Sequence, residues 1–509
     1  MMTQLFNKVK VKNVIKIIVR YKAPRDHWSV LKKKKTAKDI ALEHFDDFYK
    51  SVYGNAWPYI RTALLRKGSK YMAIINNFSD TEKIISDLEA SGAFNLKTVY
   101  DVHQENIMFR NQHTERPKKK VSTSHEQSNI NVASLLMNKN RAEVQSMYPE
   151  DYTLSAEPTI IKDEDEASKI DQPIRPMPLQ SIESGMENAD FDTNRIINPS
   201  MGLSSSSLYE YIPATKIKGL EDWVLESDHY KYYQKGADFT VKSEKESTLN
   251  FPKHLQIYTY EENNDTRFPH PKRGSTGVYN YYLLDGGSVL PVLALDLQPG
   301  DNVLDMCAAP GGKSLAAIQS LMPGVVVLND IQLSRVNRIN NVLDQYISDM
   351  GQWEGRLFVT ENDARLIQDK DVFNKILVDV PCTTDRLALH EDDNSMFKST
   401  RLKERLNLPQ VQTDILTNAL KLVAPGGIVV YSTCSLSPIQ NDGVVQMALK
   451  KSWEETESVM IVKDMSEALN PLRCLYKFGN FGLRYGHIVI PTVKNNWGPI
   501  YFCKIQRIR

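Results

Sequence analysis

The 509-residue sequence has no long apolar run, almost no net charge and few cysteines, and each of these argues against a class of protein. No apolar run reaches the roughly 18 residues that a membrane span needs, so we expect no membrane association. The formal net charge is only +1, whereas a protein that binds nucleic acid through bulk charge is usually more basic. Cysteines are few, and no pair has metal-ligand spacing, so we expect a reducing compartment and no metal site. The five cysteines are Cys307, Cys382, Cys434, Cys474 and Cys503.

Acidic residues are missing from the start of the chain, where Asp26 is the first. The preceding residues alternate lysine and arginine with valine and isoleucine. A basic, acid-free, amphipathic start is typical of a mitochondrial transit segment, which we predict for residues 1–36. A basic amphipathic tail or first strand is the alternative.

Composition divides the rest of the chain into four regions. Residues 37–110 have helical apolar spacing and form a predicted helical N-terminal region. Residues 111–204 are polar and charged, which indicates a disordered insertion. Residues 205–264 are rich in tyrosine and tryptophan and form a predicted appendage without an assigned role. Residues 265–509 form the last region, whose pattern is the most regular.

The last region alternates apolar strands with helical stretches. Continuous β-branched runs bounded by glycine and proline predict strands that are buried on both faces, as in a parallel sheet with crossover helices. The predicted strands lie at 302–305, 325–328, 357–360, 375–379 and 428–431. We therefore predict an α/β fold, Rossmann-like, with a mostly parallel twisted sheet and helices on both faces. Ligands of such sheets bind beyond the carboxyl ends of the strands.

The first strand is followed by a turn of small residues that ends in Gly311-Gly312-Lys313. Paired glycines let a ligand approach the backbone closely, and the following helix start offers free N–H groups to a carboxylate. Lys313 adds a positive charge for the same anion. The spacing is not that of a phosphate-binding P-loop, and an ordinary tight turn is the alternative.

Acids follow three later strands: Asp330, Asp363 and Asp379. An acid after the second strand of such folds typically binds ribose hydroxyls. Each acid alone could equally be a helix cap. Together with the glycine turn they fit a nucleoside cofactor that carries a charged amino acid tail, and S-adenosylmethionine has this chemistry.

Two cysteines, Cys382 and Cys434, also follow strands of the predicted sheet. A free cysteine is usually a small buried hydrophobe, but helix N-termini or neighbouring cations at such a site can lower a thiol pKa. A thiolate that adds to carbon 6 of a pyrimidine makes carbon 5 nucleophilic toward a methyl donor. The pair therefore predicts methylation at carbon 5 of a pyrimidine.

Three motifs, at residues 305–313, 379–382 and 431–435, resemble the Sun-domain RNA cytosine-carbon-5 methyltransferases in order and spacing. The resemblance covers roughly residues 265–509. After Cys382 the sequence Thr383-Thr384-Asp385-Arg386 departs from the common family continuation and looks like the mitochondrial ribosomal-RNA branch.

The resemblance implies a role for each matched residue. Cys434 is similar to the family nucleophile, Cys382 to the cysteine that assists release of the product, and Asp379 to an acid near the cytosine ring. The glycine turn would hold the methionine end of the cofactor, Asp330 the ribose and Asp363 the adenine edge. The implied cofactor-binding residues are Gly311, Gly312, Lys313, Asp330, Arg335, Asp363, Ala364 and Asp379.

The same branch implies a mitochondrial matrix enzyme that acts on ribosomal RNA and supports mitochondrial ribosome assembly. It also implies two kinds of partner, the mitochondrial ribosomal subunits and a transcription-termination-factor-like helical-repeat protein. Two alternatives stay open, a swap in which Cys382 is the nucleophile and a scaffold that keeps the cofactor fold without catalysis. A basic cluster after Cys382 is either an RNA contact or a solvated helix face; it comprises Lys398, Arg401, Lys403 and Arg405.

Overall fold

The computed structural model describes residues 35–68, 70–114, 241–261, 264 and 266–509. All of these residues except Thr114 belong to one compact unit. Most of the predicted transit segment, nearly all of the predicted disordered insertion, and the part of the appendage before residue 241 lie outside the described residues. No described helix is both long enough and apolar enough to cross a membrane.

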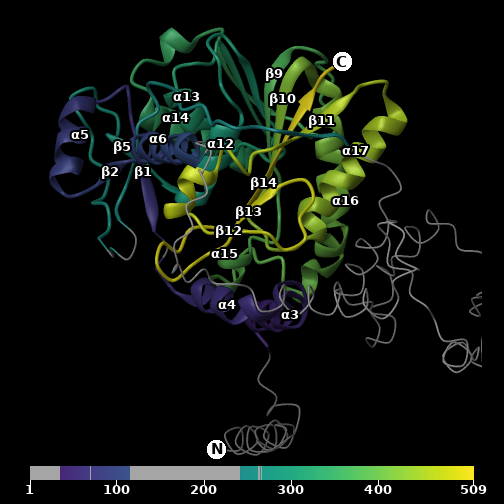
Figure 1. The fold of residues 1–509 in the computed structure, drawn as a ribbon. Coiled ribbons are helices and arrows are strands. Elements are labelled where there is room, and N and C mark those ends of the chain that lie inside the picture. The colour runs from purple at the N-terminus through teal and green to yellow at the C-terminus, as the bar shows by residue number, and fades with distance from the viewer. Residues whose placement is uncertain (1–34, 69, 115–240, 262–263, 265) are drawn as a thin grey trace, which may run out of the picture. The chain divides into compact units, whose positions relative to one another are not determined.

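The larger sheet has the strand order β12-β13-β14-β10-β9-β6-β7-β8 (Figure 1). From β10 to β8 the neighbouring strands are parallel, whereas β14 runs antiparallel to β10, β13 and β11. The α/β prediction with a mostly parallel sheet is therefore confirmed. The strands are β6 (Asn302–Asp305), β7 (Val325–Asp330), β8 (Leu357–Glu361), β9 (Phe373–Asp379), β10 (Val423–Thr433), β11 (Met460–Asp464), β12 (Phe478–Gly479), β13 (His487–Val489) and β14 (Ile500–Arg507).

Helices cover both faces of this sheet because its central strands are apolar on both sides. Consecutive residues of one strand, such as Val429 and Val430, point to opposite faces and belong to different apolar clusters, one containing residues of α16 and α17 and the other residues of α12 and α13. The helices are α12 (Val289–Ala294), α13 (Gly312–Gln319), α14 (Leu333–Tyr346), α15 (Asp385–His390), α16 (Leu402–Leu422) and α17 (Val444–Glu455).

A second, antiparallel sheet with the order β2-β4-β1-β5 joins early and late parts of the chain. β1 pairs with β5 along its whole length, from Tyr71 opposite Asp285 to Ile75 opposite Tyr281. The N-terminal region is mainly helical, as predicted, and it also contributes β1, whose apolar run is buried between strands from later in the sequence. Its strands are β1 (Tyr71–Ile75), β2 (Phe94–Asn95), β4 (Ile257–Thr259) and β5 (Tyr281–Asp285); the short β3 (Ser243–Lys245) pairs with β11 instead.

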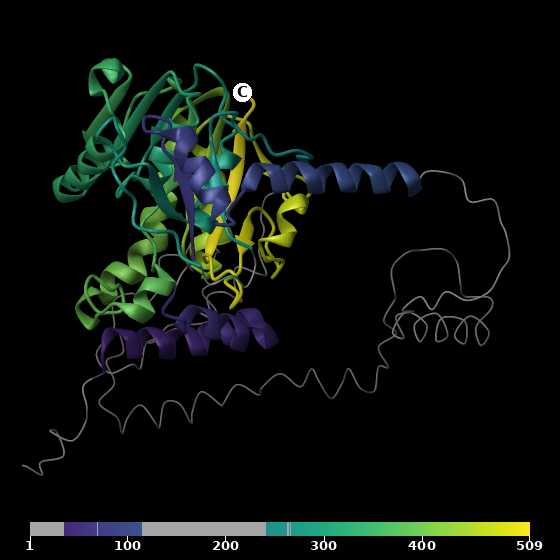
Figure 2. The ribbon, with the colours of Figure 1, turned by 90° about the vertical axis from the view of Figure 1, so that its left-hand side faces the viewer.

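The N-terminal helices share a core with the larger sheet. α3 begins at a Thr36 capping box and places Phe45 and Tyr49, both fully buried, in the same apolar cluster as β9 and β10. α3 and α4 lie beside α15 (Figure 1), and α6 projects from the body toward the right in Figure 2. The helices of this region are α3 (Ala37–Tyr53), α4 (Trp57–Leu65), α5 (Thr81–Ala90) and α6 (Leu96–Thr114).

Candidate active site

The two predicted active cysteines meet at the ends of adjacent strands. β9 and β10 are parallel, with Asp379 opposite Ser432, so the loops that follow them leave the sheet at the same edge. The Sγ atoms of Cys382 and Cys434 lie 2.9 Å apart. Cys382 is buried and Cys434 is half-buried. The structure therefore places two thiols at one point, where the sequence shows them 52 residues apart.

Asp379 and Lys313 form an ion pair beside the thiols. Lys313 Nζ lies 2.7 Å from Asp379 Oδ2, and the Ser432 hydroxyl donates to Asp379 Oδ1 over 2.7 Å. The side chain of Lys313 is 14% exposed, so this pair is weakly screened. Although burial opposes the charged form, the carboxylate raises the pKa of Lys313. The pair fixes one positive and one negative charge next to Cys434.

The pKa of the Cys434 thiol differs from the sequence-based prediction. It lies well above its usual range, because the thiol interacts with Cys382 and is buried, and because Asp379 adds negative charge nearby. Lys313 opposes this shift without overcoming it. The expectation of a lowered pKa is thus wrong for the protein alone, because the neighbouring thiol and carboxylate outweigh the single cation. Ionisation of Cys434 requires added positive charge or a base.

The glycine turn after β6 has the backbone that a close ligand requires. Gly311 has a φ of 107°, which disfavours any residue with a Cβ, and a Cβ on Gly312 would lie 2.9 Å from the Tyr282 ring. Beneath the turn, Asp305 accepts a hydrogen bond from the Ser314 hydroxyl, which ties the end of β6 to α13. Burial raises the pKa of Asp305 to about 7. The first N–H groups of α13 have no acceptor within the helix and can bind a carboxylate.

Asp330 and Arg335 hold the same turn from the side of β7. Asp330 is 2% exposed, and its Oδ2 accepts from Ala309 N over 3.3 Å and lies 3.2 Å from Arg335 Nε. Arg335 Nη2 donates to Ala309 O. The structure therefore joins both predicted residues to the glycine turn, and their roles toward a ribose stay predictions.

Asp363 and Ala364 lie farther along the sheet edge, after β8. Asp363 forms a two-pronged ion pair with Arg365, which lowers the pKa of Asp363, while Ala364 is buried and its carbonyl accepts from Asn418. Neither residue contacts the thiol pair, and their roles toward an adenine also stay predictions.

Asn329, which sequence reasoning missed, ties the loop after β8 to the loop after β6. Its Nδ2 donates to the carbonyls of Met306 and Asn362, and its Oδ1 accepts from Asn362 N and the Thr360 hydroxyl. Its position at the end of β7, one residue before Asp330, is the only signal that the sequence carried.

A buried network around Asp385 connects both cysteine loops to the N-terminal helix α3. Asp385 Oδ2 accepts from the Tyr49 hydroxyl over 2.6 Å and from Leu436 N over 2.7 Å. The hydroxyls of Thr383 and Ser435 donate to the same carboxyl group. Burial raises the pKa of Asp385. This network positions the loop after Cys382 against the loop after Cys434.

A pocket of about 420 Å³ opens onto Cys434. Arg386 lines it and is anchored by donation from Nε to Gly498 O and from Nη1 to Asn496 Oδ1. Its Nη2 is buried and has no hydrogen-bond partner among the described residues. Asp285, at the end of β5, lines the same pocket. The pocket is thus lined by a guanidinium, a carboxyl group and a thiol.

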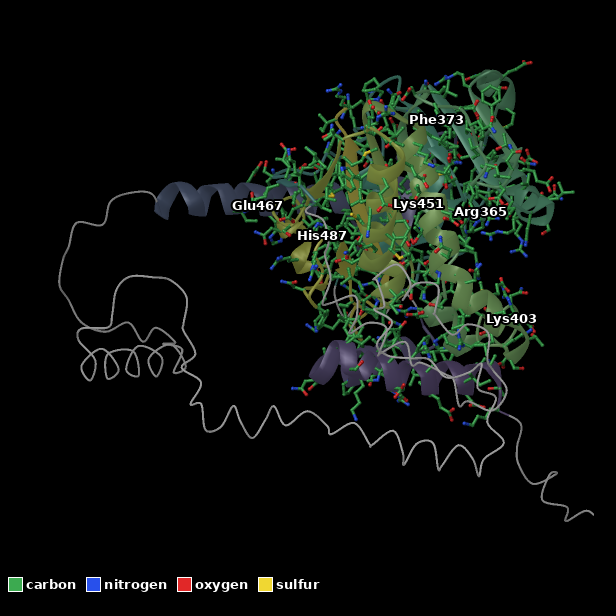
Figure 3. The ribbon with its side chains drawn as sticks, turned by 90° about the vertical axis from the view of Figure 1, so that its right-hand side faces the viewer. Arg365, Phe373, Lys403, Lys451, Glu467 and His487 are labelled. Atoms are coloured by element: carbon green, nitrogen blue, oxygen red, sulfur yellow. The ribbon has the colours of Figure 1, made fainter. Side chains whose placement is uncertain are left out.

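The basic cluster after Cys382 divides into buried and exposed residues. Arg405 is 7% exposed and packs its guanidinium 4.6 Å from the centre of the Phe397 ring, so a phosphate contact is wrong for this residue. Arg401 pairs with Glu404. Lys403 is exposed at the start of α16 (Figure 3), and Lys398 is half-buried. Lys398 and Lys403 are therefore the members of the cluster most available to a phosphate.

The strand order, the glycine turn with its positive φ and the acids at the strand ends define the class of S-adenosylmethionine-dependent methyltransferases. A sequence model of the family described as 16S rRNA methyltransferase RsmB/F matches residues 292–471. A 5-cytosine rRNA methyltransferase of Caenorhabditis elegans, named nsun-4, is 32% identical over 504 residues, which cover 96% of this chain and 97% of that protein. The chain belongs to the Sun-domain family of rRNA cytosine-5 methyltransferases.

Two vertebrate relatives show how the similarity is distributed. The 5-cytosine rRNA methyltransferase NSUN4 of Xenopus laevis is 30% identical over 95% of this chain and 93% of its own length. The protein of the same name from Bos taurus is 44% identical over 50% of this chain and 66% of its own length. The family resemblance seen in the sequence motifs is thus confirmed.

Proposed function

We propose that this protein methylates carbon 5 of a cytosine in mitochondrial ribosomal RNA, with Cys434 as the covalent nucleophile. One observation carries the proposal: the sulfurs of Cys434 and Cys382 lie 2.9 Å apart beside the Lys313–Asp379 pair. Two thiols at one point suit a reaction in which one sulfur bonds the base and the other acts when that bond breaks.

Cys434 attacks the base, and Cys382 removes a proton from it after methyl transfer. The Cys434 thiolate forms a bond to carbon 6, and the electrons of the carbon 5–carbon 6 double bond make carbon 5 a nucleophile. After carbon 5 has gained its methyl group, the Cys382 thiolate removes the proton from carbon 5. The double bond then reforms and expels Cys434 as a thiolate. Cys434 faces the pocket that holds Arg386, which is a further reason to assign it the attack.

The residues of the glycine turn fit an amino acid tail. Gly311, Gly312 and the N–H groups of α13 would hold its carboxylate, and the carboxylate of Asp379 would hold its ammonium. S-adenosylmethionine supplies an electrophilic methyl group on a positively charged sulfur. Such a charge near Cys434 favours the thiolate and so offsets the increase in the Cys434 pKa that Cys382 and burial cause.

The target cytosine must leave its helix or be unpaired to reach Cys434. In the pocket, Arg386 Nη2 would donate to an oxygen of the base, where negative charge develops as the thiolate adds. Its two other nitrogens are already bound to Gly498 O and Asn496 Oδ1, so only a local opening around Nη2 would be needed to expose this donor to the base.

The location and partners rest on the chain start and on the relatives. A relative of Danio rerio that is 38% identical over 50% of this chain is named a mitochondrial tRNA (cytosine(34)-C(5))-methyltransferase. The acid-free basic start supports import into the matrix. We extend the proposal to the mitochondrial ribosomal subunits and to a helical-repeat partner of the transcription-termination-factor type, whose basic surface would supplement the near-zero net charge.

Methyl transfer to isolated ribosomal RNA tests the proposed activity. The protein is incubated with S-adenosylmethionine carrying a labelled methyl group, and 5-methylcytosine is measured in the digested RNA by mass spectrometry. We expect 5-methylcytosine with the wild type and none with Cys434→Ala. A product methylated at any other atom, or equal product from Cys434→Ala, would contradict the proposal.

The scaffold alternative makes a different prediction in cells. If catalysis is the required role, Cys434→Ala fails to restore mitochondrial ribosome assembly in cells that lack the protein. Full rescue by Cys434→Ala would show that the fold suffices as a scaffold.

A further inference from the structure

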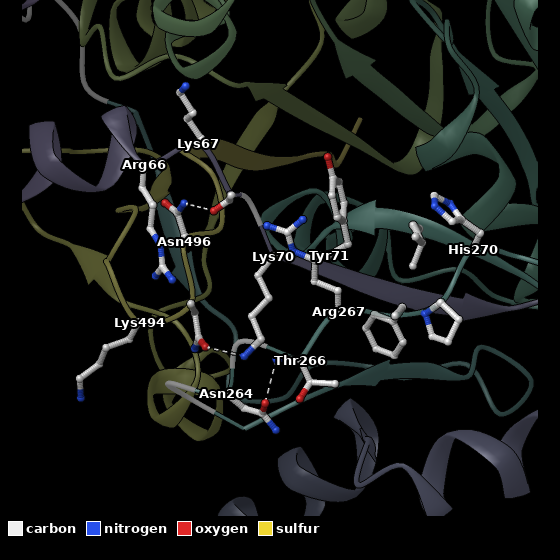
Figure 4. A pocket seen from close by; sticks show the side chains of 15 residues that line it. Arg66, Lys67, Lys70, Tyr71, Asn264, Thr266, Arg267, His270, Lys494 and Asn496 are labelled. Atoms are coloured by element: carbon white, nitrogen blue, oxygen red, sulfur yellow. Dashed lines mark hydrogen bonds between the residues drawn. The ribbon is translucent and has the colours of Figure 1, made fainter.

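A strongly basic pocket, drawn in Figure 4, shares lining residues with the pocket that contains Cys434. It has a volume of about 720 Å³, within the range of roughly 300–1,000 Å³ that small-molecule sites have. No aspartate or glutamate is among its lining residues in the described part of the chain. Its basic side chains, which come from three separate segments, are Arg66, Lys67, Lys70, Arg267 and Lys494.

The basic pocket and the Cys434 pocket share a wall. Arg66, Lys67 and Tyr71 line both. Asn496, which is 2% exposed, bridges them: its Nδ2 donates to Gly68 O over 2.6 Å on one side, and its Oδ1 accepts from Arg386 Nη1 over 2.7 Å on the other. A ligand in the basic pocket would thus lie next to a ligand that contacts Arg386 and Cys434.

The cations differ in how they are held. Lys70 Nζ donates to Tyr260 O, Glu261 O and Asn495 Oδ1, which fixes the ammonium in the wall. Lys67 and Arg267 are exposed, and neither forms an ion pair with a described residue. A Cβ at Gly68 would lie 3.3 Å from Arg267 Nη2, so the glycine leaves room for this guanidinium. The pocket therefore has one cation, Lys70, fixed in its wall and two exposed cations, Lys67 and Arg267.

An aromatic ring accompanies these charges. Tyr71, the first residue of β1, is 45% exposed, and Phe268 and His270 also line the pocket. Cations that follow a sugar-phosphate backbone, combined with aromatic faces on which bases stack, are the usual means of binding single-stranded RNA. A free inorganic anion would not stack on the exposed ring, so the ring indicates a ligand that also carries a base.

We propose that the basic pocket binds the nucleotide directly next to the target cytosine, with Lys67 and Arg267 on its phosphate and Tyr71 against its base. This inference rests on the proposed function, because it assumes that the Cys434 pocket receives a cytosine of an RNA strand. Asn496 then sets the spacing between the flanking nucleotide and the target base. The RNA segment must be single-stranded over at least these two positions.

The salt dependence of RNA binding tests the inference. The full-length double variant Lys67→Ala/Arg267→Ala is compared with wild type by fluorescence anisotropy. The ligand is a short, unmethylated, single-stranded ribosomal RNA fragment that contains a cytosine methylated by the wild-type protein. Each phosphate contact contributes about 0.7 to the slope of log Kd against log salt concentration for single strands. We expect the slope to fall by about 0.7 for one lost phosphate and Kd at 0.15 M salt to rise about fourfold.

A matched control removes the same charges elsewhere. Lys253 and Arg338 are exposed and line neither pocket. Lys253→Ala/Arg338→Ala should keep the wild-type slope and Kd, because the RNA does not contact these residues. Both double variants should unfold at the wild-type temperature, since all four side chains are exposed.

The outcomes separate the two proposals. If wild type methylates the fragment but Lys67→Ala/Arg267→Ala binds it like the control variant, the basic pocket does not hold RNA and only this inference fails. Loss of binding to polyglutamate with unchanged RNA binding would reassign the pocket to an acidic protein segment and also overturn it. If wild type neither binds nor methylates RNA, the proposed function itself is wrong.

Discussion

The hydrogen bond between Tyr49 and Asp385 gives a direct test of how the N-terminal helix supports the active site. Tyr49→Phe removes one hydroxyl and keeps the ring, which is 1% exposed and stacks on Phe45. The lost bond is 2.6 Å long and ends on a buried carboxyl group. Hydrogen bonds to charged groups contribute about 1.5–3 kcal/mol, so we expect the free energy of unfolding to fall by about 2 kcal/mol.

The assay is urea denaturation followed by tryptophan fluorescence, together with steady-state methyl transfer. Tyr100→Phe is the matched control, because its hydroxyl accepts from Leu249 N and, among the described residues, contacts neither cysteine loop through a hydrogen bond. We expect the control to cost about 1 kcal/mol and to leave kcat unchanged, whereas Tyr49→Phe also lowers kcat. In a double-mutant cycle, Tyr49→Phe and Asp385→Asn should couple by at least about 1 kcal/mol. Additivity within about 0.5 kcal/mol, or an unchanged kcat, would refute the reasoning.

Three further predictions concern pH and the glycine turn. Burial lowers the pKa of His487 (Figure 3) to about 4, so the free energy of unfolding should fall by up to about 3 kcal/mol as the pH falls from 6.5 to 4. A urea midpoint that does not change over this pH range, or the same fall in His487→Gln, would contradict this prediction. Gly311→Ala should destabilise the fold by about 1–2 kcal/mol and weaken S-adenosylmethionine binding in calorimetry, whereas Gly355→Ala, also at positive φ, should only destabilise. Because the pKa of Cys434 is raised, its alkylation by iodoacetamide should accelerate from pH 7 to 9; equal rates would show a preformed thiolate.

The sequence was sufficient for the parallel sheet because its strands are short β-branched runs that end at glycine, proline or acids. Their order in the sheet places Asp330, Asp379 and Cys434 at one edge, as the rule for parallel sheets predicts. The contact between Cys382 and Cys434 then follows from the adjacency of β9 and β10.

Residues that depend on distant segments could not be predicted. Tyr49 and Asp385 are 336 positions apart, and each alone reads as an ordinary helix residue. β1 was missed because its partner β5 lies some 200 residues later. Arg405 looks like one more cation in a basic run, and only the packing of Phe397 beneath it reveals its burial.

The most direct test of the central claim is the fate of the bond between Cys434 and the base. Cys382→Ala and Cys434→Ala are each incubated with S-adenosylmethionine and ribosomal RNA and then separated on a denaturing gel. We predict a protein–RNA adduct that accumulates in Cys382→Ala, and neither adduct nor 5-methylcytosine in Cys434→Ala. An adduct or methylated product from Cys434→Ala would contradict the assignment and make Cys382 the nucleophile.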